Sequence, residues 1–297
     1  MELKHLTSFI SVAEQLSFVR AATELHISQP ALTGQIQKLE AELGVRLLFR
    51  NHRQVKLTDA GTVFLAESRA VLARSRLAAD RAQRAAKGEI GRLRLGFVSS
   101  AALEIVPGIV VGFRKKYPQV AFDLTNVRTS TQVKSLLNRS IDIGFLRLPL
   151  SNDELRITTI HREPFVVVLP QDHVLAKARQ VRIAELQNEK FIAYGRRWAP
   201  GFYDSIVRLC HAAGFTPDIV QETGEMYTAI SLVAAGSGIA ILPQSVVLAQ
   251  SKNVVMKKLP SSVAISEIAI AVRKDDSSPL TEAFVTMARD FCKKISI

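Results

Sequence analysis

Residues 17–44 read SFVRAATELHISQPALTGQIQKLEAELG and predict two short helices joined by a tight turn. Ser17 and Ser28 stand where each helix would begin, and a serine hydroxyl can accept a hydrogen bond from the first turn. Gly44 is suited to the end of the second helix. Apolar side chains follow helical spacing along this helix and place one face in a core: Leu32, Ile36, Leu39 and Leu43. A preceding helix adds a second apolar stripe: Leu6, Phe9, Ile10, Ala13 and Leu16.

The opposite face of the second helix carries small, amide and hydroxyl side chains. Such side chains fit the major groove of DNA and can hydrogen-bond to base edges. From this pattern alone, a DNA-reading helix and a solvated face of a helical bundle are about equally well supported. The candidate DNA contacts at the start and along this face are Ser28, Gln29, Pro30, Thr33, Gln37 and Lys38.

Residues 45–57 predict a small two-stranded wing whose apolar residues flank a polar turn at 50–53. Residues 46–56 hold four basic side chains and no acidic one. Arg50 and Arg53, in the turn, are suited to contact phosphates or the minor groove. The wing therefore moves the interpretation of the amino-terminal bundle toward DNA binding.

A long helix is predicted from residue 59 to residue 87. Thr58 and Asp59 provide a cap and a negative charge at its start, and no proline follows. At ~1.5 Å per residue the helix would be roughly 45 Å long. Its apolar residues have no obvious domain to cover them, so we expect the same helix of a second chain to pair with Phe64, Val71 and Leu72.

From residue 92 onward, strand-like and helix-like segments alternate. This order is typical of largely parallel sheets covered by helices, and the length allows two lobes. Strands are expected at 93–97, 120–124, 141–146, 165–169, 191–194, 218–221, 239–242 and 268–272. Helices are expected at 103–117, 132–138, 202–213, 226–235 and 280–295.

Polar residues in this region stand between a strand and the helix that follows, where free N–H groups form a natural carboxylate site. Two serines follow the first strand and a threonine follows the second, although each fits a plain helix cap equally well. An arginine ends the third strand. It could place a positive charge in a cleft, or it could equally be a solvated strand end. Two aromatic residues could form an apolar wall for a ligand. They could equally well have only a packing role in the core. These candidates are Ser99, Ser100, Thr129, Arg147, Trp198 and Phe202.

Composition and charge exclude several classes of protein. With 47% hydrophobic and 22% charged residues, the 297-residue chain is neither collagen-like nor disordered. No apolar run approaches the roughly 20 residues that span a bilayer, and residues 1–16 lack the apolar core of a secretory signal, so we expect a cytoplasmic protein with no membrane partner. Histidines and the two cysteines show no metal-ligand spacing, and no catalytic motif occurs. We therefore expect no metal, no cofactor and no enzymatic activity.

The net charge of +12 favours a polyanionic or carboxylate partner. The excess is spread along the chain, with +2 in residues 1–58, +3 in residues 59–88 and +7 in the remainder. Because basic cytosolic enzymes also exist, the charge by itself does not identify the function.

Four segments resemble the signature of the LysR-type transcriptional regulators: residues 18–32, 35–40, 44–50 and 57–61. The resemblance continues through the long helix to IDIGF at 141–145 and AGSGIAILP at 235–243, so it covers the whole chain in order. It implies a winged helix-turn-helix, a dimerising linker helix and a two-lobed effector domain similar to periplasmic binding proteins. Gly34 departs from the pattern, because many members carry a polar or basic side chain there.

The resemblance also implies a mode of action. Such regulators bind promoters as dimers of dimers, act with RNA polymerase, and change the bending of DNA when a small ligand enters the cleft between the lobes. In the branch that responds to aromatic acids, polar residues at positions matching Ser99 and Thr129 contact the effector.

We therefore predict a homotetrameric, sequence-specific transcription activator controlled by an aromatic acid or, as a second choice, a short-chain carboxylate. The expected fold is α/β with an N-terminal all-α winged helix-turn-helix. Its domains are a DNA-binding domain at 1–58, a linker helix at 59–88 and an effector domain at 89–297, with lobe I at about 91–163 and 268–297 and lobe II at about 164–267. The alternatives are a solute-binding or enzymatic α/β protein whose bundle only oligomerises it, and an architectural DNA binder without a ligand.

Overall fold

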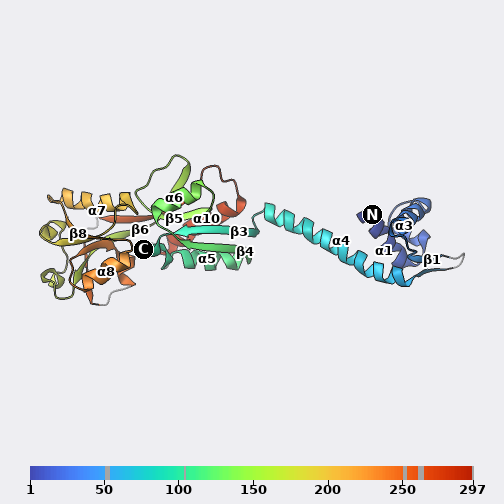
Figure 1. The fold of residues 1–297 in the computed structure, drawn as a ribbon, viewed down its shortest axis with the longest axis horizontal. Coiled ribbons are helices and arrows are strands. Elements are labelled where there is room, and N and C mark those ends of the chain that lie inside the picture. The colour runs from blue at the N-terminus through green and yellow to red at the C-terminus, as the bar shows by residue number, and fades with distance from the viewer. Residues whose placement is uncertain (51–53, 104, 250–252, 260–263, 296–297) are drawn as a thin grey trace. The chain divides into compact units, whose positions relative to one another are not determined.

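A computed structural model describes residues 1–50, 54–103, 105–249, 253–259 and 264–295. The chain forms two compact units, Met1–Arg84 and Ala85–Ile297 (Figure 1). Each unit has its own buried core.

The first unit is a three-helix bundle followed by a two-stranded wing and a long helix. Its elements are α1 (Leu3–Gln15), α2 (Phe18–Glu24), α3 (Gln29–Leu43), β1 (Leu48–Arg50), β2 (Val55–Leu57) and α4 (Asp59–Ala86). The predicted caps are confirmed, because Ser17 accepts a hydrogen bond from the N–H of Arg20 and Ser28 accepts one from the N–H of Ala31. Gly44 ends α3 in the left-handed conformation, with φ of 69°.

One prediction about the apolar residues of this unit is wrong. Leu16 lies outside the apolar stripe, because it is the exposed left-handed residue that ends α1. Phe64, expected to face a partner chain, is half-buried within this unit and packs on Phe9, with 5.4 Å between the ring centroids. The first turns of α4 therefore belong to the core of the bundle, and only the later part of this helix is free of it.

Two of the signature segments, 35–40 and 57–61, each contain a residue that lies against the backbone of the wing. The Glu40 carboxylate accepts hydrogen bonds from the N–H groups of Leu47 and Leu48, at 2.8 and 3.1 Å, and so joins α3 to the wing. Gly61 lies so close to the wing that a Cβ there would stand 2.0 Å from the carbonyl oxygen of Leu47. Any larger residue at position 61 would push α4 away.

The second unit has two lobes, which we define by their elements. Lobe I contains β3 (Ile90–Phe97), η1 (Ser99–Ala102), α5 (Ile105–Lys116), β4 (Gln119–Asn126), α6 (Thr129–Leu137), β5 (Ile143–Arg147), the first half of β6 (Leu155–Pro170), β11 (Ile265–Arg273) and α10 (Pro279–Ile295). Lobe II contains the second half of β6, η2 (Val174–Lys177), η3 (Ile183–Leu186), β7 (Lys190–Tyr194), α7 (Pro200–Ala212), β8 (Asp218–Thr223), α8 (Met226–Ala234), β9 (Ala240–Pro243), α9 (Gln244–Leu248) and β10 (Val254–Lys258).

The sheet of lobe I lies between two layers of helices (Figure 1). Alternate residues of β11 face opposite layers: Ile268 and Ile270 pack with α5 and α10, whereas Ala269 and Ala271 pack with α6. The IDIGF segment fastens this sheet. Asp142 accepts hydrogen bonds from the backbone and side chain of Arg94, at 2.6–3.0 Å.

The prediction of largely parallel sheets is correct only for part of the second unit. The pairs β3–β4, β3–β5 and β7–β8 are parallel, whereas β6 pairs antiparallel with β9, β10 and β11, and β11 with β5. The reason is that β6 runs through both lobes. Its first half pairs with β11, and its second half pairs with β9 and β10.

Candidate functional site

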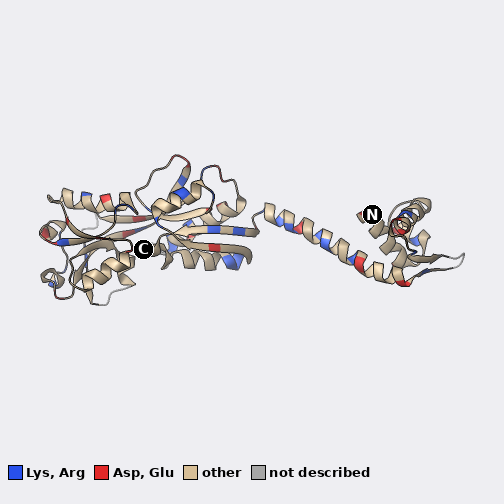
Figure 2. Ribbon diagram, in the orientation of Figure 1, with Lys and Arg blue, Asp and Glu red and all other residues tan. Residues whose placement is uncertain are grey.

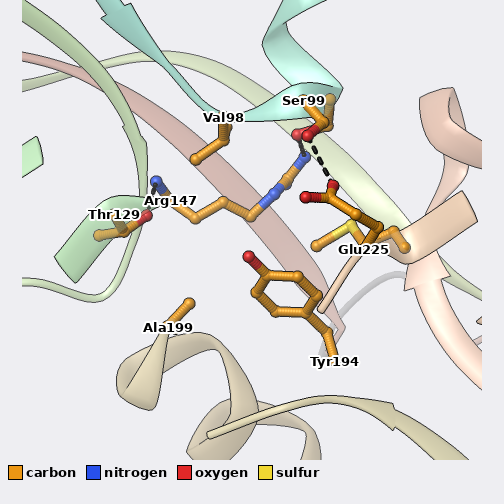
Figure 3. Close-up of a pocket in the computed structure, with 9 residues that line it drawn as sticks. Val98, Ser99, Thr129, Arg147, Tyr194, Ala199 and Glu225 are labelled. Atoms are coloured by element: carbon orange, nitrogen blue, oxygen red, sulfur yellow. Dashed lines mark hydrogen bonds between the residues drawn. The ribbon is translucent and has the colours of Figure 1, made fainter. Parts of the chain in front are cut away.

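A cavity lies between the two lobes of the second unit (Figure 3). The space inside it is about 320 Å³, open solvent at its mouth included. Lobe I contributes Val98, Ser99, Ser100, Thr129 and Arg147, and lobe II contributes Tyr194, Ala199, Glu225 and Met226. The lining residues follow the carboxyl ends of parallel strands, where open α/β sheets bind ligands.

Four helical elements begin at this cavity. Ser99 starts η1 and Thr129 starts α6, while Ala199 and Glu225 directly precede α7 and α8. The first turn of a helix has free N–H groups and a partial positive charge, so these starts favour an anion in the space between them. The structure thus brings together four of the residues expected from sequence: Ser99, Ser100, Thr129 and Arg147.

Arg147 is buried, with 2% of its surface exposed, so it is not a solvated strand end. Its guanidinium donates hydrogen bonds to Ser100 Oγ at 2.8 Å and to Ser266 Oγ, and it lies 3.4 Å from the Glu163 carboxylate. Its backbone N–H donates to Thr129 Oγ1 at 3.2 Å. Burial lowers the pKa of Arg147, and the carboxylate of Glu163 opposes that shift.

Glu225 places a carboxylate at the mouth of the cavity. Its Oε2 accepts a hydrogen bond from the hydroxyl of Ser99 at 2.7 Å (Figure 3). Its Oε1 lies 3.8 Å from Nη2 of Arg128. Sequence reasoning missed both Glu225 and Arg128. The signal was present for Glu225, because it stands between a strand and a helix just as Ser99 and Thr129 do.

The two aromatic candidates lie outside the lining of the cavity. Phe202, 1% exposed, belongs to the core of lobe II, with its ring 5.6 Å from the guanidinium carbon of Arg147. Trp198 contacts two arginines: the guanidinium carbons of Arg128 and Arg197 lie 5.0 and 4.1 Å from the centroid of its ring. The aromatic wall of the cavity is Tyr194, whose pKa is raised by burial and by the charge of Glu225.

The face of α3 opposite its core is exposed, as expected for a surface that reads DNA. Ser28, at the cap, and Gln29, Pro30, Gln37 and Lys38 are exposed, and Thr33 is half-buried. A Cβ added at Gly34 would meet nothing within 4 Å, so packing within this chain does not require a glycine there. Of the wing residues, Arg50 ends β1 and Arg53 lies outside the described residues.

Basic side chains are spread along α4 and over the second unit rather than gathered on α3, whose sequence holds only Lys38 (Figure 2). On the later part of α4, Val71 and Leu77 are 44% and 40% exposed, and Leu72 is half-buried. This segment therefore offers apolar surface to another helix.

No helix in the part of the chain that the structure describes is both long and apolar enough to cross a bilayer. Within the same residues, no three His, Cys, Asp or Glu side chains gather where they could hold a metal ion.

A winged helix-turn-helix joined to a two-lobed α/β unit with a polar cavity defines a DNA-binding protein that also carries a ligand-binding unit. Residues 3–62 match the bacterial regulatory helix-turn-helix family of the lysR type, and residues 86–293 match the LysR substrate binding domain. The chain belongs to the LysR family of DNA-binding transcription regulators, which are not enzymes.

Its relatives are similar over nearly their whole length. The regulator AlsR of Bacillus subtilis is 41% identical, over 96% of this chain and 94% of its own. The Hca operon transcriptional activator HcaR of Escherichia coli is 32% identical, over 98% of each chain. Among solved structures, full-length CbnR in complex with its target DNA superposes with a TM-score of 0.85 at 29% identity, covering 98% of this chain and 100% of its own.

Proposed function

We propose that a small organic acid bound between the lobes controls DNA binding by this regulator. Residues 1–58 bind the promoter, residues 59–88 form the dimerising helix, and residues 89–297 bind the effector. The matched family segments, 3–62 and 86–293, support this division. A protein that acts on promoter DNA works in the cytoplasm and, as an activator, meets RNA polymerase there; the relative HcaR is named as an activator.

The main support for an acidic effector is that four helical elements begin at one cavity. Their free N–H groups, together with the hydroxyls of Ser99, Ser100 and Thr129, suit a carboxylate. Tyr194 and Met226 offer apolar surface to the rest of the ligand. An aromatic acid is our first choice because a ring can pack on Tyr194, and a short aliphatic acid is the second.

The DNA interface is the exposed face of α3 together with the wing. Gln29, Thr33 and Gln37 supply groups for base edges, and Lys38, Arg50 and Arg53 supply charge for phosphates or the minor groove. Ser28 and Pro30 shape the start of α3. Pairing of α4 with its copy gives a homodimer, and two dimers form the tetramer that binds a promoter.

The test combines calorimetry with a DNA-binding titration of the full chain. Ser99→Ala should weaken binding of the best acid from a screen of benzoates, phenylpropanoids and short-chain acids by about 0.5–3 kcal/mol, the value of one hydrogen bond. It should leave binding to a promoter duplex without effector unchanged. Ser237→Ala, an exposed serine of lobe II outside the cavity, is the matched control. Normal acid binding by Ser99→Ala, or binding of neutral or cationic compounds only, would show that the site is misassigned.

A further inference from the structure

The cavity already contains a carboxylate of the protein's own. Glu225 is the N-cap residue of α8, where an acid usually accepts a hydrogen bond from the first turn of its helix. Its side chain makes no such bond. It extends instead across the cleft and accepts the hydroxyl proton of Ser99 in lobe I, at 2.7 Å (Figure 3). The Glu225 side chain therefore bonds to a residue of the cavity and does not cap α8.

The charges around the cavity balance before any ligand enters. The positive charge of Arg147 faces Glu163, and that of Arg128 faces Glu225. Glu225 is the acidic residue among the described residues that line the cavity. An effector carboxylate placed beside it would meet a like charge, which is unfavourable at short range. The anion must therefore lie away from Glu225, toward the start of α6 at Thr129.

The two ends of the cavity therefore favour different groups of a ligand: a hydrogen-bond acceptor at one end and a hydrogen-bond donor at the other. On the Arg147 side, Nε of this buried arginine has no hydrogen-bond partner among the described residues, so an acceptor that reached it would satisfy a buried donor. On the other side, an ionised Glu225 can only accept hydrogen bonds and needs a donor. In the present arrangement Ser99 is that donor.

We propose that Glu225 is a specificity-determining residue that selects an effector carrying a hydroxyl, or another hydrogen-bond donor, in addition to its carboxylate. The hydroxyl of the ligand takes the place of the Ser99 hydroxyl on Glu225. The freed Ser99 hydroxyl then donates to the ligand carboxylate, which lies toward Thr129 and Arg147. The effector class is thus a hydroxy acid. This inference rests on the proposed function, because it assumes that an acid occupies the cavity.

The experiment measures dissociation constants by calorimetry for matched pairs of ligands on the full chain. Benzoate is compared with its three monohydroxy isomers, and propanoate with lactate. We expect the best hydroxy acid to bind the unaltered protein about tenfold or more tightly than its parent acid, as one hydrogen bond to a charged group provides. Glu225→Gln should tighten binding of the parent acid several-fold and reduce the preference to about twofold or less, because the like charge is gone.

Two further variants make the result specific. Glu225→Ala, which removes the acceptor, should abolish the preference. Glu222→Gln removes the same charge from an exposed residue of β8 outside the cavity, and it should keep the original preference. Thermal unfolding of each variant verifies that it is folded.

The possible failures can be distinguished. Acids that bind, but without a preference for the hydroxy acid or with a preference that survives Glu225→Gln, would overturn this inference and leave the proposed function standing. If none of the six acids binds any folded variant, the acid effector is overturned and the inference falls with it.

Discussion

Removal of one partner of the buried ion pair between Arg147 and Glu163 should strongly destabilise the second unit, because the other charge stays buried without compensation. Their side chains are 2% and 6% exposed, and 3.4 Å separates Nη2 from Oε1. The other carboxylate oxygen of Glu163 accepts the N–H of Ser245 at 2.7 Å, so Glu163 connects β5 with the start of α9. Glu163→Gln keeps the shape of this side chain and one of its two acceptor oxygens, but it leaves the charge of Arg147 uncompensated.

Removal of one partner of a buried pair costs about 3–5 kcal/mol, and we expect the lower end because the amide still accepts a hydrogen bond. For a slope of about 2–3 kcal/mol per molar urea, the unfolding midpoint should fall by about 1 M. Trp198, the one tryptophan of the chain, lies in lobe II, so its fluorescence reports on the second unit. The double variant Arg147→Met with Glu163→Gln should lose less than the sum of the two single losses.

An exposed pair provides the control. Arg92 and Asp123 are 2.6 Å apart with side chains 63% and 45% exposed, so Asp123→Asn should cost no more than about 1 kcal/mol. A loss below about 1 kcal/mol for Glu163→Gln, or strictly additive losses in the double variant, would refute the reasoning that burial makes this pair important.

Three further predictions concern the rest of the chain. Gln37→Ala should relax base preference at one position by about 1–3 kcal/mol while non-specific binding persists, as measured by competition with altered duplexes. Val71→Asp combined with Leu72→Asp should separate the dimer in sedimentation experiments, because burying each side chain is worth roughly 1.5–3 kcal/mol; a monomeric unaltered protein at micromolar concentration would contradict it. Burial alone would raise the pKa of Asp142, but hydrogen bonds from Arg94 bring it below its ordinary value, so the stabilisation is present above about pH 4 and is lost as pH falls further. Asp142→Asn should therefore lower stability by about 1 kcal/mol at pH 7 and have little effect near pH 2, in urea titrations at both pH values; equal losses at both would contradict the assignment.

The elements of the first unit could be predicted because their signals are local. A serine cap, a spacing of three and four residues and a terminal glycine lie within one helix, as in residues 28–44. The partner of Phe64 could not be predicted in this way. The apolar stripe on α4 predicts that this ring is covered, but it does not say by which surface. The ring is half-buried, and its contact with Phe9 joins residues 55 positions apart.

The extent of β6 was missed for a related reason. Its second half, residues 165–169, is a continuous apolar run that predicts a buried strand. The first half carries Arg156, His161, Arg162 and Glu163, so it has no apolar run. It is a strand because β11 pairs along it, and β11 lies about a hundred residues further along the chain. The antiparallel centre of the unit thus depends on a long-range pairing.

The same distinction separates the parts of the cavity that sequence could and could not supply. Ser99 and Thr129 were found because each stands at the junction of a strand and a helix, and Glu225 satisfies that rule as well. From sequence alone the rule favours hydroxyl groups, because an acid at a helix start has an ordinary explanation in the helix dipole. What distinguishes Glu225 is a hydrogen bond to a residue 126 positions away, together with the missing bond to its own helix. Position between a strand and a helix can therefore identify hydroxyl and acidic candidates alike. Only the packing of one lobe against the other decides which of them face a ligand.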